Sequence, residues 1–200
     1  MNATVHLAPG FADLSRDSQT AYRRILDAMA YPGRIETIDL PLDPPVGLSA
    51  AAAAVALTLL DMDVELWLSA SLNDTLAPWA RFHCGCPVVA GAKLDAAFGL
   101  LGKGDTCPPL ATARLEDPER PDISTTLIVE CESLTGGPAL RATGPGIKDA
   151  ITVSPEGFPE QLWAERHALR SLLPLGVDLI LTAGSQVMAL PRSTRIEEID

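Results

Sequence analysis

The spacing of apolar residues near the start of the chain predicts an amphipathic helix over Ser15–Met29. Four apolar residues recur at intervals of three and four, the spacing of one helical face: Tyr22, Ile25, Leu26 and Met29. The helix should end at Tyr31-Pro32-Gly33, because the residue before a proline is pushed out of the helical region of backbone space. Arg34–Leu40 then alternates apolar and polar residues and is predicted to form a strand.

The rest of the chain alternates helical stretches with short apolar runs. Three further helices are predicted: Ser49–Leu60, Ser71–Phe82 and Pro159–Leu172. The first is alanine-rich and begins at a capping serine, and its small side chains permit close packing against a sheet or a second subunit. In the second, we expect Asn73 to be the cap and Pro78 to lie in the first turns. The predicted strands are Val64–Leu68, Pro87–Ala90, Ala96–Leu101, Ser124–Cys131, Ala139–Thr143, Val177–Leu181 and Val187–Leu190.

This order of elements predicts an α/β fold with a mixed β-sheet and flanking helices, including a C-terminal hairpin around Gly184-Ser185. Residues 1–200 form a single domain in this interpretation, with residues 1–10 flexible. Residues 102–121 are rich in proline and glycine and lack periodicity. They predict a long loop or lid with one helical turn around Leu110–Leu115.

Composition indicates a globular protein that stays in the cytoplasm. Apolar residues make up 47% of the 200 positions, enough for a sizeable core. No charge-free apolar run reaches the ~18 residues that a membrane span needs. Met1–Phe11 has neither the basic start nor the apolar centre of a signal peptide.

The charge balance disfavours nucleic acid as a partner. Fifteen basic and twenty-six acidic residues give a net charge of −11, whereas nucleic-acid binding needs a positive face. Only three basic residues are lysines (Lys93, Lys103 and Lys148), and the other twelve are arginines. Because the guanidinium group holds carboxylate or phosphate in a planar fork, this bias indicates a few local contacts with anions or partners.

The four cysteines, Cys84, Cys86, Cys107 and Cys131, are expected to be reduced thiols in a chain without a secretion signal. His83-Cys84-Gly85-Cys86 could suggest a metal site, but no second cysteine pair at zinc spacing follows. Buried small side chains are favoured over a metal site, and the sequence leaves the roles of the cysteines open.

Catalytic signatures are missing. Neither Gly-x-Ser-x-Gly, nor a phosphate-binding Gly-x4-Gly-Lys-Ser/Thr, nor Gly-x-Gly-x-x-Gly occurs. The three histidines (His6, His83 and His167) indicate no triad, and Cys84 pairs with His167 only if the fold is assumed. Asp61 and Asp63 at a helix end are more typical of solvated carboxylates. No catalytic residue and no cofactor is predicted.

One turn stands out as a candidate site. In Leu140–Ile147 a short strand ends at Gly144-Pro145-Gly146, with Arg141 before the turn and Lys148 after it. Bare N–H groups at such a turn, flanked by basic side chains, could cradle an anion. From spacing alone, an ordinary turn at a sheet edge is favoured.

Four segments, in the same order and at similar intervals, resemble the PhnH family, one of the component proteins of the bacterial carbon–phosphorus lyase system. They are Gln19-x-x-Tyr22-Arg23-x-Ile25-Leu26-x-Ala28-Met29-x-x-Pro32-Gly33, Gly144-Pro145-Gly146-Ile147, Pro174-Leu175-Gly176-Val177-Asp178 and Leu190-Pro191-Arg192-Ser193-Thr194-Arg195. The resemblance covers about Phe11 to Ile196.

The resemblance implies a fold like the large domain of pyridoxal-phosphate-dependent transferases without the cofactor site, and a homodimer. It also implies a cytosolic core complex with the PhnG, PhnI and PhnJ proteins. Together with PhnL, that assembly couples methylphosphonate to the ribose of ATP, giving ribose 1-methylphosphonate 5-triphosphate. PhnI is thought to carry the nucleosidase chemistry, and the PhnH family has no settled catalytic residues that could be transferred to this chain.

We therefore expect an accessory subunit of a phosphonate-processing enzyme whose anion-facing or partner-facing surface includes Arg34, Arg141, Gly144, Gly146, Lys148, Arg192 and Arg195. ATP and alkylphosphonate are its candidate ligands at the level of the complex. Three alternatives remain open. They are a pure scaffold that buries Ala50–Leu57 against partners and keeps only a vestigial pocket, a stand-alone anion-binding protein, and a pyridoxal enzyme that uses Lys148.

Overall fold

The computed structural model describes residues 7–115 and 124–199 of the chain. The helices are α1 (Leu14–Ala30), α2 (Ala50–Leu59), α3 (Ala70–His83) and α4 (Gln161–Leu169), with short 3-10 turns η1 (Leu110–Thr112) and η3 (Arg170–Leu172). The strands are β1 (Ile35–Thr37), β2 (Leu66–Leu68), β3 (Val88–Val89), β4 (Phe98–Leu101), β5 (Thr126–Glu130), β6 (Leu140–Thr143), β7 (Ile151–Val153), β8 (Asp178–Ala183), β9 (Gln186–Leu190) and β10 (Arg195–Glu198). Within the described residues, no helix is both long and apolar enough to cross a membrane.

Two sheets organise the fold. The larger has seven strands in the order β1-β9-β8-β5-β4-β2-β3, and the smaller has three in the order β10-β6-β7. Neighbouring strands from β3 to β8 run parallel, whereas β9 is antiparallel to both β8 and β1. The predicted α/β fold with a mixed sheet and flanking helices is confirmed, as is the hairpin of β8 and β9.

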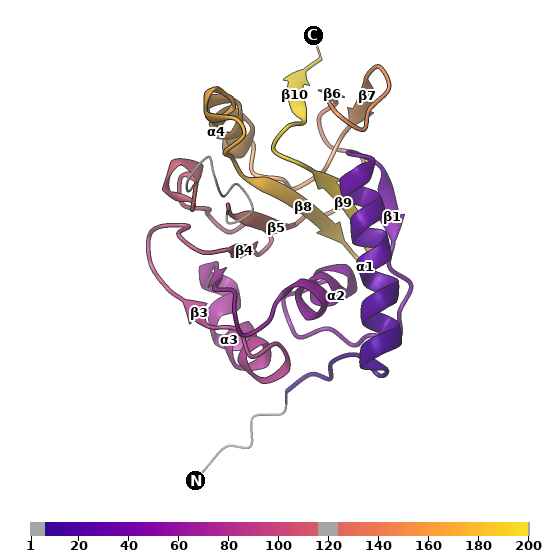
Figure 1. The fold of residues 1–200 in the computed structure, drawn as a ribbon, viewed down its shortest axis with the longest axis vertical. Coiled ribbons are helices and arrows are strands. Elements are labelled where there is room, and N and C mark those ends of the chain that lie inside the picture. The colour runs from indigo at the N-terminus through magenta and orange to yellow at the C-terminus, as the bar shows by residue number, and fades with distance from the viewer. Residues whose placement is uncertain (1–6, 116–123, 200) are drawn as a thin grey trace.

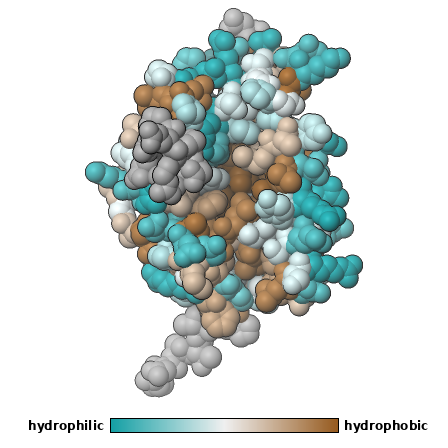
Figure 2. Space-filling view, viewed as in Figure 1, coloured by the Kyte–Doolittle hydropathy of each residue, from teal (hydrophilic) through white to brown (hydrophobic). Residues whose placement is uncertain are grey.

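The large sheet is buried on both faces, so its strands carry near-continuous apolar runs. One face packs against α1, α2 and α3 through residues such as Ile128 and Ile180. The other face packs against α4, η1 and the small sheet through alternate residues such as Leu127 and Leu179. Figure 1 shows these layers. In the same orientation, apolar residues gather in the middle of the face, and hydrophilic residues line the side where α1 lies (Figure 2).

Helix α1 begins as predicted but turns a different face to the core. Asp13 caps it by accepting a hydrogen bond from the Arg16 N–H at 3.0 Å. The buried positions are Asp17, Ala21, Ile25 and Ala28. Tyr22 and Leu26, predicted to face inward, are 51% and 53% exposed. That prediction was wrong because the small residues Ala21 and Ala28 allow the closest approach to β9 and α2, and the bulkier residues therefore turn outward.

Helix α2 lies inside the protein, and this overturns one expectation. Ser49 caps it as predicted, accepting from the Ala52 N–H at 3.1 Å. Six consecutive residues, Ala51–Ala56, are at most 1% exposed, because the helix packs against α1, α3 and the sheet. A helix that is apolar all round is a core helix. Within the Ala50–Leu57 stretch, Ala51–Ala56 are therefore buried in their own chain, and only the half-buried ends could contact a partner.

Helix α3 starts earlier than its predicted cap. The N-cap is Ser69 and not Asn73, so Pro78 lies inside the helix and not in its first turns. The Ser69 hydroxyl makes no cap bond and instead accepts from the Gly102 N–H at 2.9 Å, which joins the ends of β2 and β4. A serine used in this way leaves no local sequence signal for the helix start.

Two strands were missed, and two predicted segments are described only in part. The small sheet includes β7 and β10, which are short and carry polar residues at alternate positions. In the predicted loop of residues 102–121, η1 matches the expected helical turn, and residues 116–123 lie outside the described part. Of the start predicted as flexible, residues 1–6 also lie outside it, whereas Leu7 and Ala8 pack against the core.

Candidate functional site

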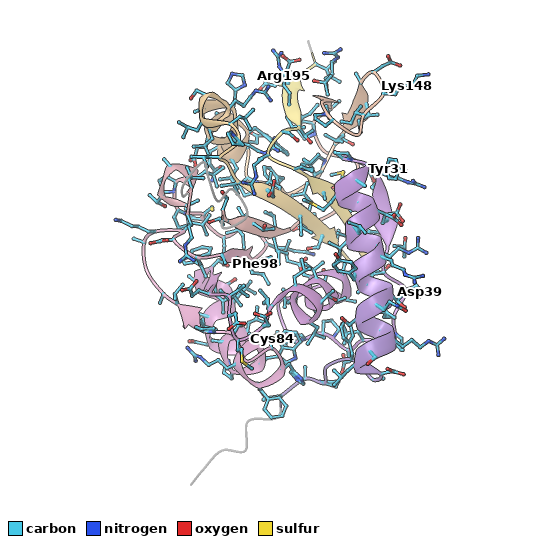
Figure 3. All side chains as sticks on the ribbon, in the orientation of Figure 1. Tyr31, Asp39, Cys84, Phe98, Lys148 and Arg195 are labelled. Atoms are coloured by element: carbon cyan, nitrogen blue, oxygen red, sulfur yellow. The ribbon has the colours of Figure 1, made fainter. Side chains whose placement is uncertain are left out.

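A hollow of about 360 Å³ lies where the end of α1 meets the turn between β6 and β7. It is lined by Tyr31, Pro32, Gly33, Arg34, Gly146, Ile147, Lys148, Ile151 and Thr152. Two stretches more than a hundred residues apart in sequence thus build one surface feature. In Figure 3, Tyr31 lies at the end of α1 and Lys148 beyond it, on the same side of the molecule.

Glycines allow the two turns to touch. Gly146 has φ +83°, and a Cβ there would lie 2.5 Å from the carbonyl oxygen of Ala30. Gly33 has φ +80°, and its Cβ would lie 2.4 Å from Cδ1 of Ile151. The Gly33 N–H donates to the Ala189 carbonyl at 3.0 Å, which fixes this turn to β9. The two turns are therefore packed so closely that neither glycine leaves room for a side chain.

Two cations border the hollow. The Arg34 guanidinium lies 5.5 Å from the centre of the Tyr31 ring, and its Nε is 3.0 Å from a Glu36 oxygen. Glu36 also holds Arg24 at 3.2 Å, so Arg34 shares its carboxylate. Lys148 is exposed and makes no ion pair within the described part of the chain. The hollow thus presents one shared cation, one uncompensated cation and an aromatic ring.

The other predicted site residues lie elsewhere. Arg141 on β6 and Arg195 on β10 both contact Glu197, with Arg141 Nη1 3.4 Å from the carboxylate. The antiparallel register of β6 and β10 places Arg141 opposite Glu197, and Arg195 lies two residues before Glu197 on β10. Gly144 has φ +139° and starts the turn, with its carbonyl accepting from the Ile147 N–H at 3.1 Å. It shapes the hollow from outside and does not line it.

Arg192 forms an ion pair with Asp178 on β8. Its Nε lies 3.1 Å from each oxygen of Asp178, and a terminal nitrogen contacts the same carboxylate. The Asp178 carboxylate also accepts from the Arg192 backbone N–H at 2.7 Å. This forked pair ties the start of β8 to the segment after β9 and keeps Arg192 away from the hollow.

Sequence reasoning missed Arg166. It is 6% exposed and faces the core with Leu162 and Leu169, one turn away on either side. Its guanidinium donates to the carbonyls of Thr194 at 2.7 Å and Leu190 at 3.0 Å, and also to that of Pro191. Burial lowers its pKa to about 10. The helical spacing with the two leucines was the signal that could have placed it inside.

Proteins with parallel sheets commonly bind anions at the first turns of the helices that lie at the carboxyl ends of the strands. In this chain, its own carboxyl groups occupy these positions. At the start of α3, Asp105 accepts from the Ser71 N–H at 3.1 Å and from the Ser71 hydroxyl at 2.6 Å. Before α2, Glu130 accepts from the Ser49 N–H at 2.5 Å. Burial alone would raise the pKa of the Asp105 carboxyl group. The hydrogen bonds that this group accepts have the larger combined effect, so its pKa is lowered. Both helix starts are therefore already occupied by carboxyl groups of the chain itself.

Glu130 predicts a pH dependence of stability. Burial raises its pKa above the ordinary 4.5, so the folded chain binds more protons there than the unfolded chain does. Stability from this group is then lost as pH rises from about 4.5 towards the folded pKa. Glu130→Gln keeps an oxygen for the Ser49 N–H and removes the titration. We expect a urea-unfolding stability profile that falls less steeply as the pH rises above 4.5, and no lower stability at neutral pH.

The matched control is Glu132→Gln, because Glu132 is an exposed carboxylate two residues away. It should leave the profile of the wild type unchanged. If Glu130→Gln and the wild type lose the same free energy of unfolding over this pH range, Glu130 does not titrate between the folded and unfolded states.

The four cysteines are free, and their packing in the two cores is that of small apolar side chains. Cys86, Cys107 and Cys131 are buried. Burial raises the pKa of both Cys107 and Cys131 to about 12, so these thiols stay protonated at neutral pH. No cluster of three or more possible metal ligands occurs in the described residues.

Known proteins match this chain over almost its whole length. The family model for the bacterial phosphonate metabolism protein PhnH matches residues 9–197. Alpha-D-ribose 1-methylphosphonate 5-triphosphate synthase subunit PhnH of Rhizobium meliloti (strain 1021) is 42% identical over 191 residues, 94% of either chain. The putative C-P lyase subunit protein HtxG of Stutzerimonas stutzeri is 34% identical over 178 residues, 89% of this chain and 85% of its own. The chain therefore belongs to the PhnH family of bacterial phosphonate metabolism proteins.

Proposed function

We propose that this chain is an accessory, non-catalytic subunit of a carbon–phosphorus lyase assembly that acts in organic phosphonate catabolism. The observation that carries the proposal is the 42% identity, over 94% of both chains, to a protein named as a subunit of ribose 1-methylphosphonate 5-triphosphate synthase. The site geometry agrees with a supporting role. The thiols of Cys107 and Cys131 stay protonated, and the starts of α2 and α3 hold carboxyl groups of the chain itself.

Reconstitution tests this function. The chain is co-expressed in the cytoplasm with PhnG, PhnI, PhnJ and PhnL, and conversion of ATP and methylphosphonate to ribose 1-methylphosphonate 5-triphosphate is followed by phosphorus NMR. We expect product from the full set, none when this chain is omitted, and none from this chain alone. Turnover by the isolated chain, or an unchanged rate after its omission, contradicts the proposal.

The homodimer implied by the family resemblance is part of the same proposal. The outer side of α1 carries three exposed apolar residues, Leu14, Tyr22 and Leu26, spaced eight and four residues apart on one helical face. Apolar side chains in a row on a helix are suited to burial against a second copy. Light scattering on the isolated chain measures whether its mass is that of one copy or two.

The hollow between the two turns supports a proposed role beyond scaffolding. Arg34, Gly146 and Lys148 from the predicted anion surface meet there, and Lys148 lacks a carboxylate partner among the described residues. We expect it to hold a phosphate or phosphonate group of ATP or methylphosphonate. A purely structural scaffold is the second candidate, favoured by the closed helix starts.

Calorimetry separates these two roles through Lys148. The Lys148→Ala variant loses a charge-assisted contact worth roughly 1.5–3 kcal/mol. Its affinity for ATP or methylphosphonate should therefore be lower than that of the wild type by about tenfold or more. Lys93→Ala removes an exposed lysine outside the hollow, and Arg141→Ala removes one of the two arginines that contact Glu197. Both should bind as the wild type does. If the wild type gives no heat of binding with either ligand, only the scaffold role remains.

A further inference from the structure

A second, larger hollow of about 580 Å³ lies at the other end of the small sheet, where β6 begins and β7 and β10 end. Its size falls within the range of natural ligand pockets. The lining residues come from the small sheet, its connections and the start of α4: Pro138, Ala139, Leu140, Pro155, Gly157, Phe158, Glu160, Trp163, Glu198 and Ile199. None of them belongs to the hollow that contains Lys148.

One part of the wall of this hollow is apolar and aromatic. The rings of Phe158 and Trp163 stack with their centres 4.0 Å apart and their planes 25° apart. Phe158 is 7% exposed and anchors the pair in the core, whereas Trp163 is half-buried and keeps part of its ring open to the hollow. Pro138 and Pro155 lack an N–H group, so they add further surface without a donor. An apolar or flat side chain would be well accommodated here.

The rim is acidic. Glu160 and Glu198 line the hollow and are both exposed. No described residue that lines it is a lysine or an arginine. On a chain of net charge −11, this arrangement attracts cations and repels phosphate, phosphonate and nucleotide groups. The hollow is therefore unsuited to the ligands expected beside Lys148.

Backbone hydrogen bonds and close backbone contacts hold together the segments that form this hollow. The Gly137 N–H donates to the Ser154 carbonyl at 2.9 Å, and the Glu132 N–H donates to the Glu156 carbonyl at 2.9 Å. A Cβ on Gly137 would lie 2.4 Å from the Pro155 carbonyl oxygen, so the segments that carry Pro138 and Pro155 are in direct contact. A preformed site binds without the entropic cost of shaping itself.

We propose that this hollow docks an extended segment of a companion subunit, one that places a proline or aliphatic side chain on the Phe158–Trp163 stack and a lysine or arginine beside Glu160 and Glu198. Proline-containing segments dock on aromatic-lined grooves, and basic side chains complement the acidic rim. The inference rests on the proposed function as an accessory subunit. It assigns to the chain one surface for a partner protein, separate from the anion hollow.

Charge reversal at the rim tests the proposal in the co-expressed assembly. Glu160→Lys with Glu198→Lys should weaken retention of this chain on an affinity-tagged companion subunit by about tenfold or more. Asp39→Lys with Asp63→Lys makes the same change of net charge at exposed positions outside the hollow and should assemble as the wild type does. A photoreactive benzoyl-phenylalanine in place of the exposed Ala139 should cross-link to a companion segment that contains a basic and an apolar residue.

The outcomes separate this inference from the proposed function. If the wild type does not co-purify with the companion subunits, both are overturned. If the wild type and the Glu160/Glu198 variant assemble equally well, the docking site alone is overturned. Cross-linking of position 139 only to a second copy of this chain, or to an acidic segment, also overturns it.

Discussion

Replacing Arg166 by methionine is expected to lower the free energy of unfolding by about 3–5 kcal/mol, because a buried carbonyl left without a donor costs roughly 1–3 kcal/mol. The Arg166 guanidinium donates to three carbonyls, those of Leu190, Pro191 and Thr194. Methionine fills similar space and supplies no donor. Urea unfolding followed by tryptophan fluorescence measures the loss.

Two further variants identify the cause. Arg166→Lys keeps a positive charge but cannot reproduce the fork, so its stability should lie between those of the wild type and Arg166→Met. Arg23→Met removes an exposed arginine from α1 and should change the free energy of unfolding by less than about 0.5 kcal/mol. A loss for Arg166→Met as small as that for Arg23→Met would show that water replaces the guanidinium at these carbonyls.

Gly146→Ala is expected to cost about 3–5 kcal/mol and to open the hollow beside Lys148. The added Cβ would lie 2.5 Å from the Ala30 carbonyl oxygen, so backbone must move, and the residue must also keep a φ of +83°. Binding of methylphosphonate in the hollow should be lost with the contact. Urea unfolding and calorimetry on the same variant report the two effects.

Gly104→Ala is the matched control for the backbone conformation. Gly104 has a φ of +71°, and its added Cβ would meet no atom within 4 Å. This variant should therefore show only the cost of a left-handed alanine, about 1–2 kcal/mol. Equal losses at both glycines would mean that the turn at Gly146 can move away from α1 freely.

The helix starts and ends were predictable wherever a local signal marks them. Asp13, Ser49 and the Tyr31-Pro32-Gly33 stop act within a few residues of the elements that they bound, so the sequence carries them. The direction that a helix faces is set by distant partners. Tyr22 and Leu26 were expected inside and lie outside, whereas Arg166, a charged residue on a helix, lies inside.

The sequence indicated several residues that border the hollow, but not how the fold arranges them. Arg34 and Lys148 share one hollow because β6 and β7 bring their turn onto the end of α1, and β7 itself was not predicted. Arg141 and Arg195 were grouped with them, but both contact Glu197: the register with β10 places Arg141 opposite it, and Arg195 lies two residues before it on the same strand. No local pattern reveals which carboxylate an arginine will meet across two strands.

The pairing of β1 with β9 has a consequence for synthesis on the ribosome. β1 bonds only to β9 among the described strands, and these partners are about 150 positions apart in the chain. The inner side of α1, with Ala21 and Ile25, also waits for β9. β1 and the side of α1 that faces β9 thus remain incompletely packed until about 150 further residues have been synthesised, and this part of the nascent chain is open to chaperone capture in the meantime.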